Sequence, residues 1–432
     1  MTKDRTRLAT TPARPTPESC PCGDDVAVAR CRVCGGSGMT SVLCLGRLPL
    51  ANEFLPSHLA PSGRYPLHVL YCDDCCLAQL ATSVPPEQLF TEYAYFSSAS
   101  QPVLTHGTEL RRFVEKELRP TREGLIVEIG SNDGYLLKEY ASEGHRVLGI
   151  DPARNVAEFA RAQGVPTLEA FFTSRLAGRI RRDHGEISVV HANNVLAHIP
   201  AVADVLSGVR TLLDGSDGAV VIEVPYVKDL VLRGLFDTIY HEHLFYYSLT
   251  ALNRLIEAAG LVTVHVEHVR FHGGSLRVVA RAGTPRVHRS VPEMLAAEDA
   301  AGMRAPAFYQ QFGRRMTRFL TTIRQELRSI AEGSRRLAGY GAPAKASIMT
   351  GAAGIPLRYI CDSTPYKQGK VLPGTRIPIV PPGHLLADQP DYCVLFAWNY
   401  ADTIIAANQD YLRRGGVFIK PADYRLEYIG RS

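Results

Sequence analysis

Hydrophobic and polar residues alternate with different periods in successive parts of the chain. Between about residues 28 and 86, short apolar runs are separated by Cys, Pro and Gly, which is typical of a small module held together by metal. From about 100 to 285, Val- and Ile-rich runs alternate with amphipathic stretches, which predicts parallel strands with helices on both faces of a sheet. These strands are expected at 125–129, 146–150, 187–192 and 219–224.

A second set of alternating strands and helices is expected near the C-terminus. Residues 291–332 show a helical pattern interrupted at Gly302, and strands are predicted at 336–340, 357–361, 392–397 and 416–419. The predicted fold class is α/β, with two Rossmann-like domains and a small cysteine-rich module. The expected parts are a disordered tail (1–27), a zinc-binding module (28–86), a central domain (87–290), a helical connector (291–335) and a C-terminal Rossmann-like domain (336–432).

Composition narrows the class of protein. The 432 residues are 46% hydrophobic and 21% charged, which is ordinary for a globular protein. The net charge of +5 is scattered without a basic run, so a nucleic-acid partner is not expected. No apolar run approaches the roughly 18 to 20 residues that cross a bilayer, and residues 1–18 lack the apolar core of a signal peptide. We therefore expect a cytoplasmic protein without a membrane partner; no oligomeric state is indicated.

Two C-x2-C pairs, Cys31/Cys34 and Cys72/Cys75, dominate the N-terminal module. Each pair presents two thiolates from one tight turn, and two such turns make the tetrahedral sulfur set that Zn²⁺ prefers. All four positions would be filled, so the predicted zinc is structural. Buried free thiols are the alternative. The other nearby cysteines are not expected to be ligands: Cys20, Cys22, Cys44 and Cys76.

An apolar run containing Glu128 leads into a glycine-bearing loop with Gly130, Asn132 and Gly134, and a helix is predicted at 135–140. Glycines allow the backbone to pass close to a ligand. The next predicted strand ends at Asp151, where a carboxylate can hold a ribose diol. The spacing differs from the G-x-G-x-x-G dinucleotide motif. The pattern predicts a nucleoside cofactor; a purely structural turn is the alternative.

This loop resembles motif I of the class I S-adenosylmethionine methyltransferases. The resemblance implies that Glu128 and the loop surround the methionine part of the cofactor, and that Asp151 holds its ribose. In that family the next strand end, here with Asn193 and Asn194, also lines the cofactor. The N/D-P-P-Y sequence of amine methyltransferases is missing from this position, which argues against methylation of an exocyclic amine.

The segment 237–248, which begins at Asp237 and contains Tyr240-His241-Glu242-His243, is the densest cluster of titratable groups. Methylation of a carbon beside a ketone needs a base for the acidic proton and donors for the enolate oxygen, and His, carboxylate and Tyr can supply both. A buried polar turn is the alternative. The spacing excludes the H-E-x-x-H zinc site.

A second glycine-rich loop runs from Gly339 to Lys345. A glycine turn before a helix, with Lys at the helix start, suits a diphosphate, and Asp362 ends the next predicted strand. Pro343 weakens an interpretation as an NAD site, because proline lacks the N–H that a phosphate would accept. A turn that binds nothing is the alternative.

Taken together, these segments resemble the deoxysugar C-methyltransferases of antibiotic biosynthesis, which act on thymidine-diphosphate-linked (dTDP-linked) 4-keto sugars. The resemblance runs from about 31 to 428. It is carried by the cysteine pairs and by segments 93–98, 127–134, 191–200, 240–243, 272–275, 339–345 and 397–400.

This resemblance implies a zinc module, a central S-adenosylmethionine domain and a C-terminal Rossmann-like domain, with the sugar nucleotide between them. It implies that His243 removes the proton beside the keto group, with help from Tyr240 and Glu242. His198 and either Tyr93 or Tyr95 would contact the sugar. Further substrate contacts are expected from Ser98, Tyr340, Lys345 and Asn399. Methylation is expected at C3, with C5 as the alternative.

Two other functional classes fit parts of the sequence. One is a zinc-containing dehydrogenase that uses the loop from Gly339 for NAD, and the other is a zinc-ribbon adaptor or nucleic-acid module without catalytic activity. Binding of S-adenosylmethionine separates both from the methyltransferase.

Overall fold

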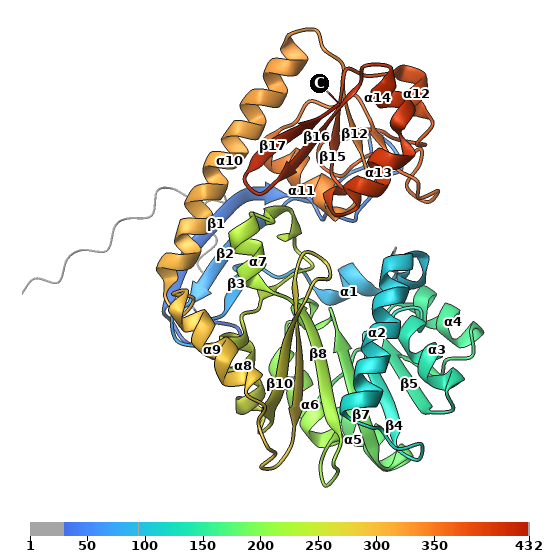
Figure 1. The fold of residues 1–432 in the computed structure, drawn as a ribbon, viewed down its shortest axis with the longest axis vertical. Helices are drawn as coiled ribbons and strands as arrows, with labels where there is room; N and C mark the ends of the chain where they lie inside the picture. The colour runs from blue at the N-terminus through green and yellow to red at the C-terminus, as the bar shows by residue number, and fades with distance from the viewer. Residues whose placement is uncertain (1–29, 94, 431–432) are drawn as a thin grey trace, which may run out of the picture.

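The computed structural model describes residues 30–93 and 95–430. The expected disordered tail, Cys20 and Cys22 lie outside these residues. The described chain contains three sheets (Figure 1). In Figure 1 the C-terminal sheet lies at the top and the largest sheet at the bottom, with the N-terminal strands between them. No helix among the described residues is long and apolar enough to span a membrane.

The N-terminal sheet is antiparallel and combines two distant parts of the chain. β1 pairs with β2, β2 with β3, and β3 with β9. Its strands are β1 (Met39–Leu48), β2 (Tyr65–Cys72), β3 (Ala78–Leu80) and β9 (Phe245–Tyr246). β9 comes from the part of the sequence assigned to the central domain, and it directly follows the segment Tyr240–His243. We call residues 31–90, which carry β1 to β3, the cysteine module.

The central sheet has the strand order β10-β11-β8-β7-β4-β5-β6. The four predicted strands are all present as β4 (Leu125–Ile129), β5 (Arg146–Asp151), β7 (Ile187–Asn193) and β8 (Ala219–Pro225), with β6 (Thr167–Glu169) at one edge. These four strands are parallel, as expected. The other edge was not predicted: β11 (Ser275–Arg281) runs antiparallel to β8 and β10 (Val262–Val269) antiparallel to β11. A short turn joins β10 to β11, and only antiparallel neighbours can be joined so briefly.

Helices cover both faces of this sheet, which explains the continuous apolar runs of its inner strands. On β4, Ile126 faces one apolar cluster, while Leu125 and Val127 face another. The first cluster includes residues of α2 (Gln101–Glu117), α3 (Tyr135–Ser142) and α4 (Arg154–Ala162). The second includes residues of α5 (Ser174–His184), α6 (Val202–Leu212) and α8 (Leu249–Ala258).

The C-terminal sheet has the order β14-β13-β12-β15-β16-β17 and is parallel except for β17. The predicted strands are present, although β13 is much shorter than the expected 357–361. The strands are β12 (Leu337–Tyr340), β13 (Ile360–Cys361), β14 (Ile379–Val380), β15 (Tyr392–Leu395), β16 (Val417–Ala422) and β17 (Arg425–Ile429). Its helices are α11 (Ala344–Ala353), α12 (His384–Asp388), α13 (Ala401–Ala407) and α14 (Gln409–Arg413).

The helical connector consists of α9 (Ser290–Ala300) and α10 (Pro306–Glu332), separated near the predicted break at Gly302. α10 extends from the central domain to the C-terminal sheet (Figure 1). Its buried residues recur every three or four positions, among them Tyr309, Met316 and Ile323. A Cβ on Gly313 would meet the carbonyl of Val42 at 1.8 Å, so α10 and β1 approach too closely for any side chain at this position.

Most candidate site residues lie on or beside short helical elements between the strands. They are α1 (Pro86–Phe90), η1 (Ser97–Ala99), η2 (Leu196–His198), α7 (Val227–Arg233), η3 (Phe236–Thr238) and η4 (Trp398–Tyr400).

Candidate active site

The four predicted cysteine ligands come together in the cysteine module. Their sulfur atoms all lie within 4.8 Å of one another, with Cys31 and Cys75 3.7 Å apart and Cys34 and Cys72 3.6 Å apart. Zn–S bonds of about 2.3 Å in a tetrahedron require S···S distances of about 3.8 Å, so the set fits zinc. The amide of Gln79 donates to the sulfur of Cys31 over 3.0 Å, an outer contact that orients this ligand.

The first glycine-rich loop leaves β4 in left-handed backbone conformations, with φ of +69° at Gly130 and +48° at Asn132. A Cβ on Gly130 would also lie 2.6 Å from a methyl group of Val195, so only glycine fits here. The N–H of Asn132 donates to Oδ2 of Asp151 over 2.9 Å. Asp151 therefore holds the loop, and each of its oxygens keeps a lone pair for a further donor such as a ribose hydroxyl.

Unpaired buried acceptors lie around this loop. Oε1 of Glu128 accepts from the amide of Asn193 over 3.3 Å, while Oε2 has no partner among the described residues. Oδ1 of Asp133, Asn193 and Asn194 is likewise buried without a described partner. Burial, and then the neighbouring Asp133 and Asp151, raise the pKa of Glu128 to about 8. A pocket of unpaired acceptors suits a ligand that carries positive charge and N–H donors.

Tyr240 and His243 meet in the turn between η3 and β9. Nδ1 of His243 lies 2.7 Å from the carbonyl of Thr238, and Nε2 lies 2.9 Å from the hydroxyl of Tyr240. A carbonyl only accepts, so Nδ1 carries the proton and Nε2 accepts from Tyr240. Burial and then the charge of His198 lower the pKa of His243 to about 3, so its imidazole is neutral.

His198 lies beside His243, with their ring centroids 4.9 Å apart. Its Nδ1 donates to the backbone carbonyl of Glu242 over 2.8 Å, which leaves Nε2 as an acceptor. Burial lowers the pKa of His198 to about 4. The contact fixes η2, at the end of β7, against the turn that carries His243.

The side chain of Glu242 contacts the cysteine module. Its Oε1 accepts from the amide of Asn52 over 2.7 Å, and Oε2 is buried without a described partner. Burial raises the pKa of Glu242 to about 7, while Asn52 and then Tyr93 act in the opposite direction. The group that orients His243 is the Thr238 carbonyl, because a backbone acceptor already lies in reach of Nδ1.

The two candidate tyrosines are distinguished by position. Tyr93 is half-buried beside Glu242, and its backbone is held by Asn155, whose amide donates to the Tyr93 carbonyl over 2.8 Å. Tyr95 is 45% exposed. His241 points away from the cluster, because its Nε2 lies 3.2 Å from the carbonyl of Tyr65.

Residues of the C-terminal domain approach the same turn. The ammonium of Lys345 lies 3.7 Å from the centre of the Trp398 ring, and the indole N–H of Trp398 donates to Oδ2 of Asp237 over 2.6 Å. The pKa of His272 falls to about 4, first because of burial and then because of the positive charge of Lys345.

The remaining predicted substrate residues lie on separate elements. The N–H of Ser98 donates to Asp133 over 2.8 Å. Tyr340 ends β12 half-buried, and Asn399 is exposed in η4. Asp362 accepts from the N–H of Ala342 over 2.6 Å, so it holds the second loop as Asp151 holds the first.

Four residues of the site were not predicted: Asn52, Asp133, Asp237 and Trp398. Asp133 and Trp398 lie within segments that carried the family resemblance, which was a usable signal. Asp237 begins the predicted cluster of titratable groups at 237–248 but was assigned no role. Asn52 carries no local pattern, because its partner is distant in sequence.

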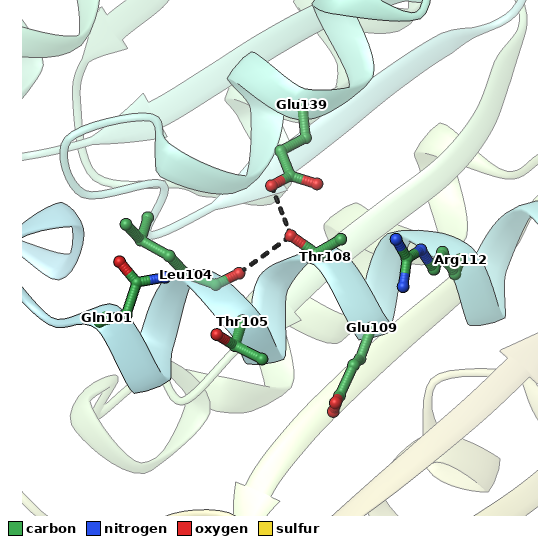
Figure 2. Close-up of a pocket in the computed structure, with 7 residues that line it drawn as sticks. All are labelled: Gln101, Leu104, Thr105, Thr108, Glu109, Arg112 and Glu139. Carbon is green, nitrogen blue, oxygen red and sulfur yellow. Dashed lines mark hydrogen bonds between the residues drawn. The ribbon is translucent and has the colours of Figure 1, made fainter.

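A surface depression between α2 and α3 lies apart from these groups (Figure 2). The hydroxyl of Thr108 there donates to Glu139 over 2.6 Å. None of the seven lining residues is a predicted site residue, so we assign no role in catalysis to this depression. They are Gln101, Leu104, Thr105, Thr108, Glu109, Arg112 and Glu139.

The fold and these groups define a class I S-adenosylmethionine-dependent methyltransferase with an added zinc-binding module. Family models match along the chain: "Putative zinc binding domain" at 31–90, "Methyltransferase domain" at 104–266 and "C-methyltransferase C-terminal domain" at 270–422. The chain belongs to the C-methyltransferase family that these domains compose. It is 39% identical over 401 residues to the C-methyltransferase NovU of Streptomyces niveus, covering 91% of this chain and 95% of that protein.

Solved structures match the central part of the chain. Magnesium protoporphyrin IX methyltransferase from Synechocystis PCC 6803, with bound S-adenosylmethionine, is 14% identical, covers 42% of this chain and 82% of its own, and has a TM-score of 0.31. The PH0226 protein from Pyrococcus horikoshii OT3 is 15% identical, covers 47% of this chain and 100% of its own, and has a TM-score of 0.36.

The predicted cofactors are S-adenosylmethionine and zinc, and the residues present fit both. The unpaired oxygens of Glu128, Asp133 and Asn193 would provide acceptors for the ammonium and a negative environment for the sulfonium of S-adenosylmethionine. Asp151, at the end of β5, keeps acceptor capacity for the ribose. The four thiols provide a closed sulfur set for structural zinc.

Proposed function

We propose that this enzyme methylates the carbon next to the keto group of a 4-keto deoxysugar linked to thymidine diphosphate. One observation carries the proposal: a neutral imidazole, His243, is held with Nδ1 protonated and Nε2 as an acceptor beside two further hydrogen-bonding groups, Tyr240 and His198. Enolate formation needs a base that removes the proton and a donor for the enolate oxygen. His243, oriented by a backbone carbonyl, can be the base, and the phenol of Tyr240 can be the donor.

In the proposed reaction, Nε2 of His243 takes the proton from the carbon beside the ketone. The electron pair of that C–H bond forms the enolate, whose oxygen accepts hydrogen bonds from Tyr240 or Tyr93. The hydroxyl of Tyr240 leaves Nε2 as it turns to the oxygen. Negative charge on the enolate then raises the low pKa of His243 while the proton is held.

S-adenosylmethionine supplies an electrophilic methyl group to the enolate carbon. Ionised Glu242, near Tyr93 in the same cluster, stabilises positive charge on His243 during this step. His198, through its free Nε2, accepts from a sugar hydroxyl and positions the ring.

The sugar nucleotide is placed between the central and C-terminal domains in this proposal. Lys345 lies against Trp398, which contacts the catalytic turn through Asp237, and it carries the positive charge that a diphosphate would meet. Tyr340 and Asn399, at β12 and η4, are proposed nucleotide contacts, and Ser98 is a proposed contact on the cofactor side. A four-cysteine zinc site needs reduced sulfur atoms, which favours a reducing compartment and hence the cytoplasm.

The test is incubation of the purified enzyme with S-adenosylmethionine and a panel of dTDP-linked 4-keto sugars, followed by mass spectrometry. We expect one sugar to gain a single methyl group. C3 and C5 both adjoin a C4 ketone, and NMR of the product assigns the carbon. Methylation on oxygen or nitrogen, or none with any keto sugar, would overturn the proposal.

A further inference from the structure

Trp398 and Asp237 join the C-terminal domain to the catalytic turn. The indole N–H donates to Oδ2 of Asp237 over 2.6 Å, and both side chains are buried, 6% and 1% exposed. On the face of the same indole lies the ammonium of Lys345, 3.7 Å from the ring centre. The indole therefore lies between a carboxylate in its plane and a cation on its face, which is the arrangement that its charge distribution favours.

Asp237 is the middle residue of η3, and the next residue, Thr238, provides the carbonyl that accepts from Nδ1 of His243. The direction of that carbonyl decides which nitrogen of His243 carries the proton. The indole is the side-chain hydrogen-bond donor to the Asp237 carboxylate, which also has its own backbone N–H and the Lys345 ammonium nearby. Loss of the Trp398 contact would thus remove a donor from a buried carboxylate, and a shift of η3 would be needed to replace that donor with water.

A tight turn with two glycines packs against Trp398 and the start of η3. His272, Gly273 and Gly274 all have positive φ, and a Cβ on Gly273 would lie 3.0 Å from Leu235, at the start of η3, and 3.6 Å from Trp398. Trp398 and η3 are therefore packed against a tightly turned backbone. The indole has little room to change its direction without moving η3.

We propose that Trp398, acting through Asp237 and the Thr238 carbonyl, is a positioning residue that sets the tautomer and orientation of His243. The C-terminal domain thereby contributes to proton abstraction as well as to substrate binding. This inference rests on the proposed role of His243 as the base. The contact crosses from one domain to another, so correct placement of the C-terminal domain becomes a condition for an active base.

The test uses the full-length enzyme and three substitutions. Trp398→Phe and Asp237→Ala remove the hydrogen bond, whereas Asp237→Asn keeps an acceptor oxygen for the indole. Trp398→Phe and Asp237→Ala should each lower kcat by about 10- to 100-fold, which is part of the rate enhancement that a positioned base contributes. The Kd for S-adenosylmethionine should stay within about twofold of the wild-type value. Asp237→Asn should retain most of the wild-type kcat. Tyr411→Phe, a buried aromatic elsewhere in the C-terminal domain, is the matched control and should be unchanged.

A second readout does not depend on turnover. In ¹⁵N-histidine NMR, with the His243 signals assigned by their loss in His243→Asn, the wild type should show Nδ1 protonated and Nε2 unprotonated. Trp398→Phe should show averaged shifts for the two nitrogens, and Asp237→Asn the wild-type pattern. An unchanged His243 spectrum in folded Trp398→Phe would overturn the inference. If no keto sugar is methylated by the wild type, the proposed function fails, and the NMR result still decides whether Trp398 orients His243.

Discussion

The amide of Asn52 donates a 2.7 Å hydrogen bond to the carboxylate of Glu242, across 190 positions of sequence. Asn52 follows β1 of the cysteine module, and Glu242 belongs to the turn that leads into β9, which pairs with β3 of the same module. The cysteine module therefore forms one wall of the candidate active site. Because Asn52 belongs to the module that the structural zinc holds together, loss of the zinc is expected to affect catalysis indirectly.

Replacing Asn52 with Ala should lower kcat by roughly 5- to 20-fold, because a lost hydrogen bond to a charged group costs about 1.5 kcal/mol or more. The KM for S-adenosylmethionine should stay constant, since Asn52 lies away from the first glycine-rich loop. Steady-state kinetics checks both values. Asn253→Ala, which removes an exposed amide contact to Glu257, is the control and should behave as wild type. Equal losses in both variants would remove the special role of Asn52.

Zinc should be bound at about one ion per chain, and Cys72→Ser should lose it together with activity, because three thiolates hold the metal far less well than four. Metal analysis and thermal unfolding measure the change. Cys76→Ser alters a buried neighbour outside the sulfur set and should keep its zinc. Full zinc content in Cys72→Ser would show that another residue is the ligand.

Binding of S-adenosylmethionine should tighten as the pH rises towards 8. Burial raises the pKa of Glu128 to about 8, so this carboxyl is protonated at neutral pH in the free protein. The cationic cofactor favours the ionised form and lowers that pKa, so binding releases protons below pH 8 and the gain in affinity levels off above it. Calorimetry in buffers of different ionisation enthalpy measures the release. Glu128→Gln should bind without releasing protons; the same release in this variant would assign it to another group.

The rate of methyl transfer should rise with pH through about 7, because Glu242 has a pKa near 7 and, in the proposed mechanism, its ionised form stabilises positive charge on His243. His243, with its pKa near 3, stays neutral around pH 7 and therefore adds no pH dependence to the rate there. The pH profile of kcat should become flat in Glu242→Gln, which keeps an oxygen for Asn52. If kcat of Glu242→Gln still rose with pH through about 7, another residue would be the titrating group.

His243→Asn should lower kcat by at least about 100-fold, the usual contribution of a positioned general base, while the Kd for S-adenosylmethionine remains near that of the wild type. His241→Gln is the matched control, because His241 contacts the carbonyl of Tyr65 on the far side of the turn. Near-normal turnover in His243→Asn would exclude it as the base.

Sequence alone predicted the elements whose signals are local. The run around Val127 identified β4 because a parallel strand buried on both faces is apolar throughout, and the cysteine spacing identified the sulfur set. It could not choose between Tyr93 and Tyr95, since both lie in one short segment and only folding places Tyr93 beside Glu242. Asn52, and the partner of Asp237, were missed for a related reason, because each hydrogen bond joins residues more than a hundred positions apart.

Gly313 of α10, in contact with the carbonyl of Val42, has a consequence for chimeric enzymes. α10 is fitted to β1 of its own cysteine module, although it leads into the C-terminal domain. A graft meant to import another sugar preference should therefore be joined after α10, between 333 and 336, so that the helix stays with the module that it matches. A junction before 306 would place a foreign helix on β1, and any side chain larger than glycine at position 313 would force the two apart.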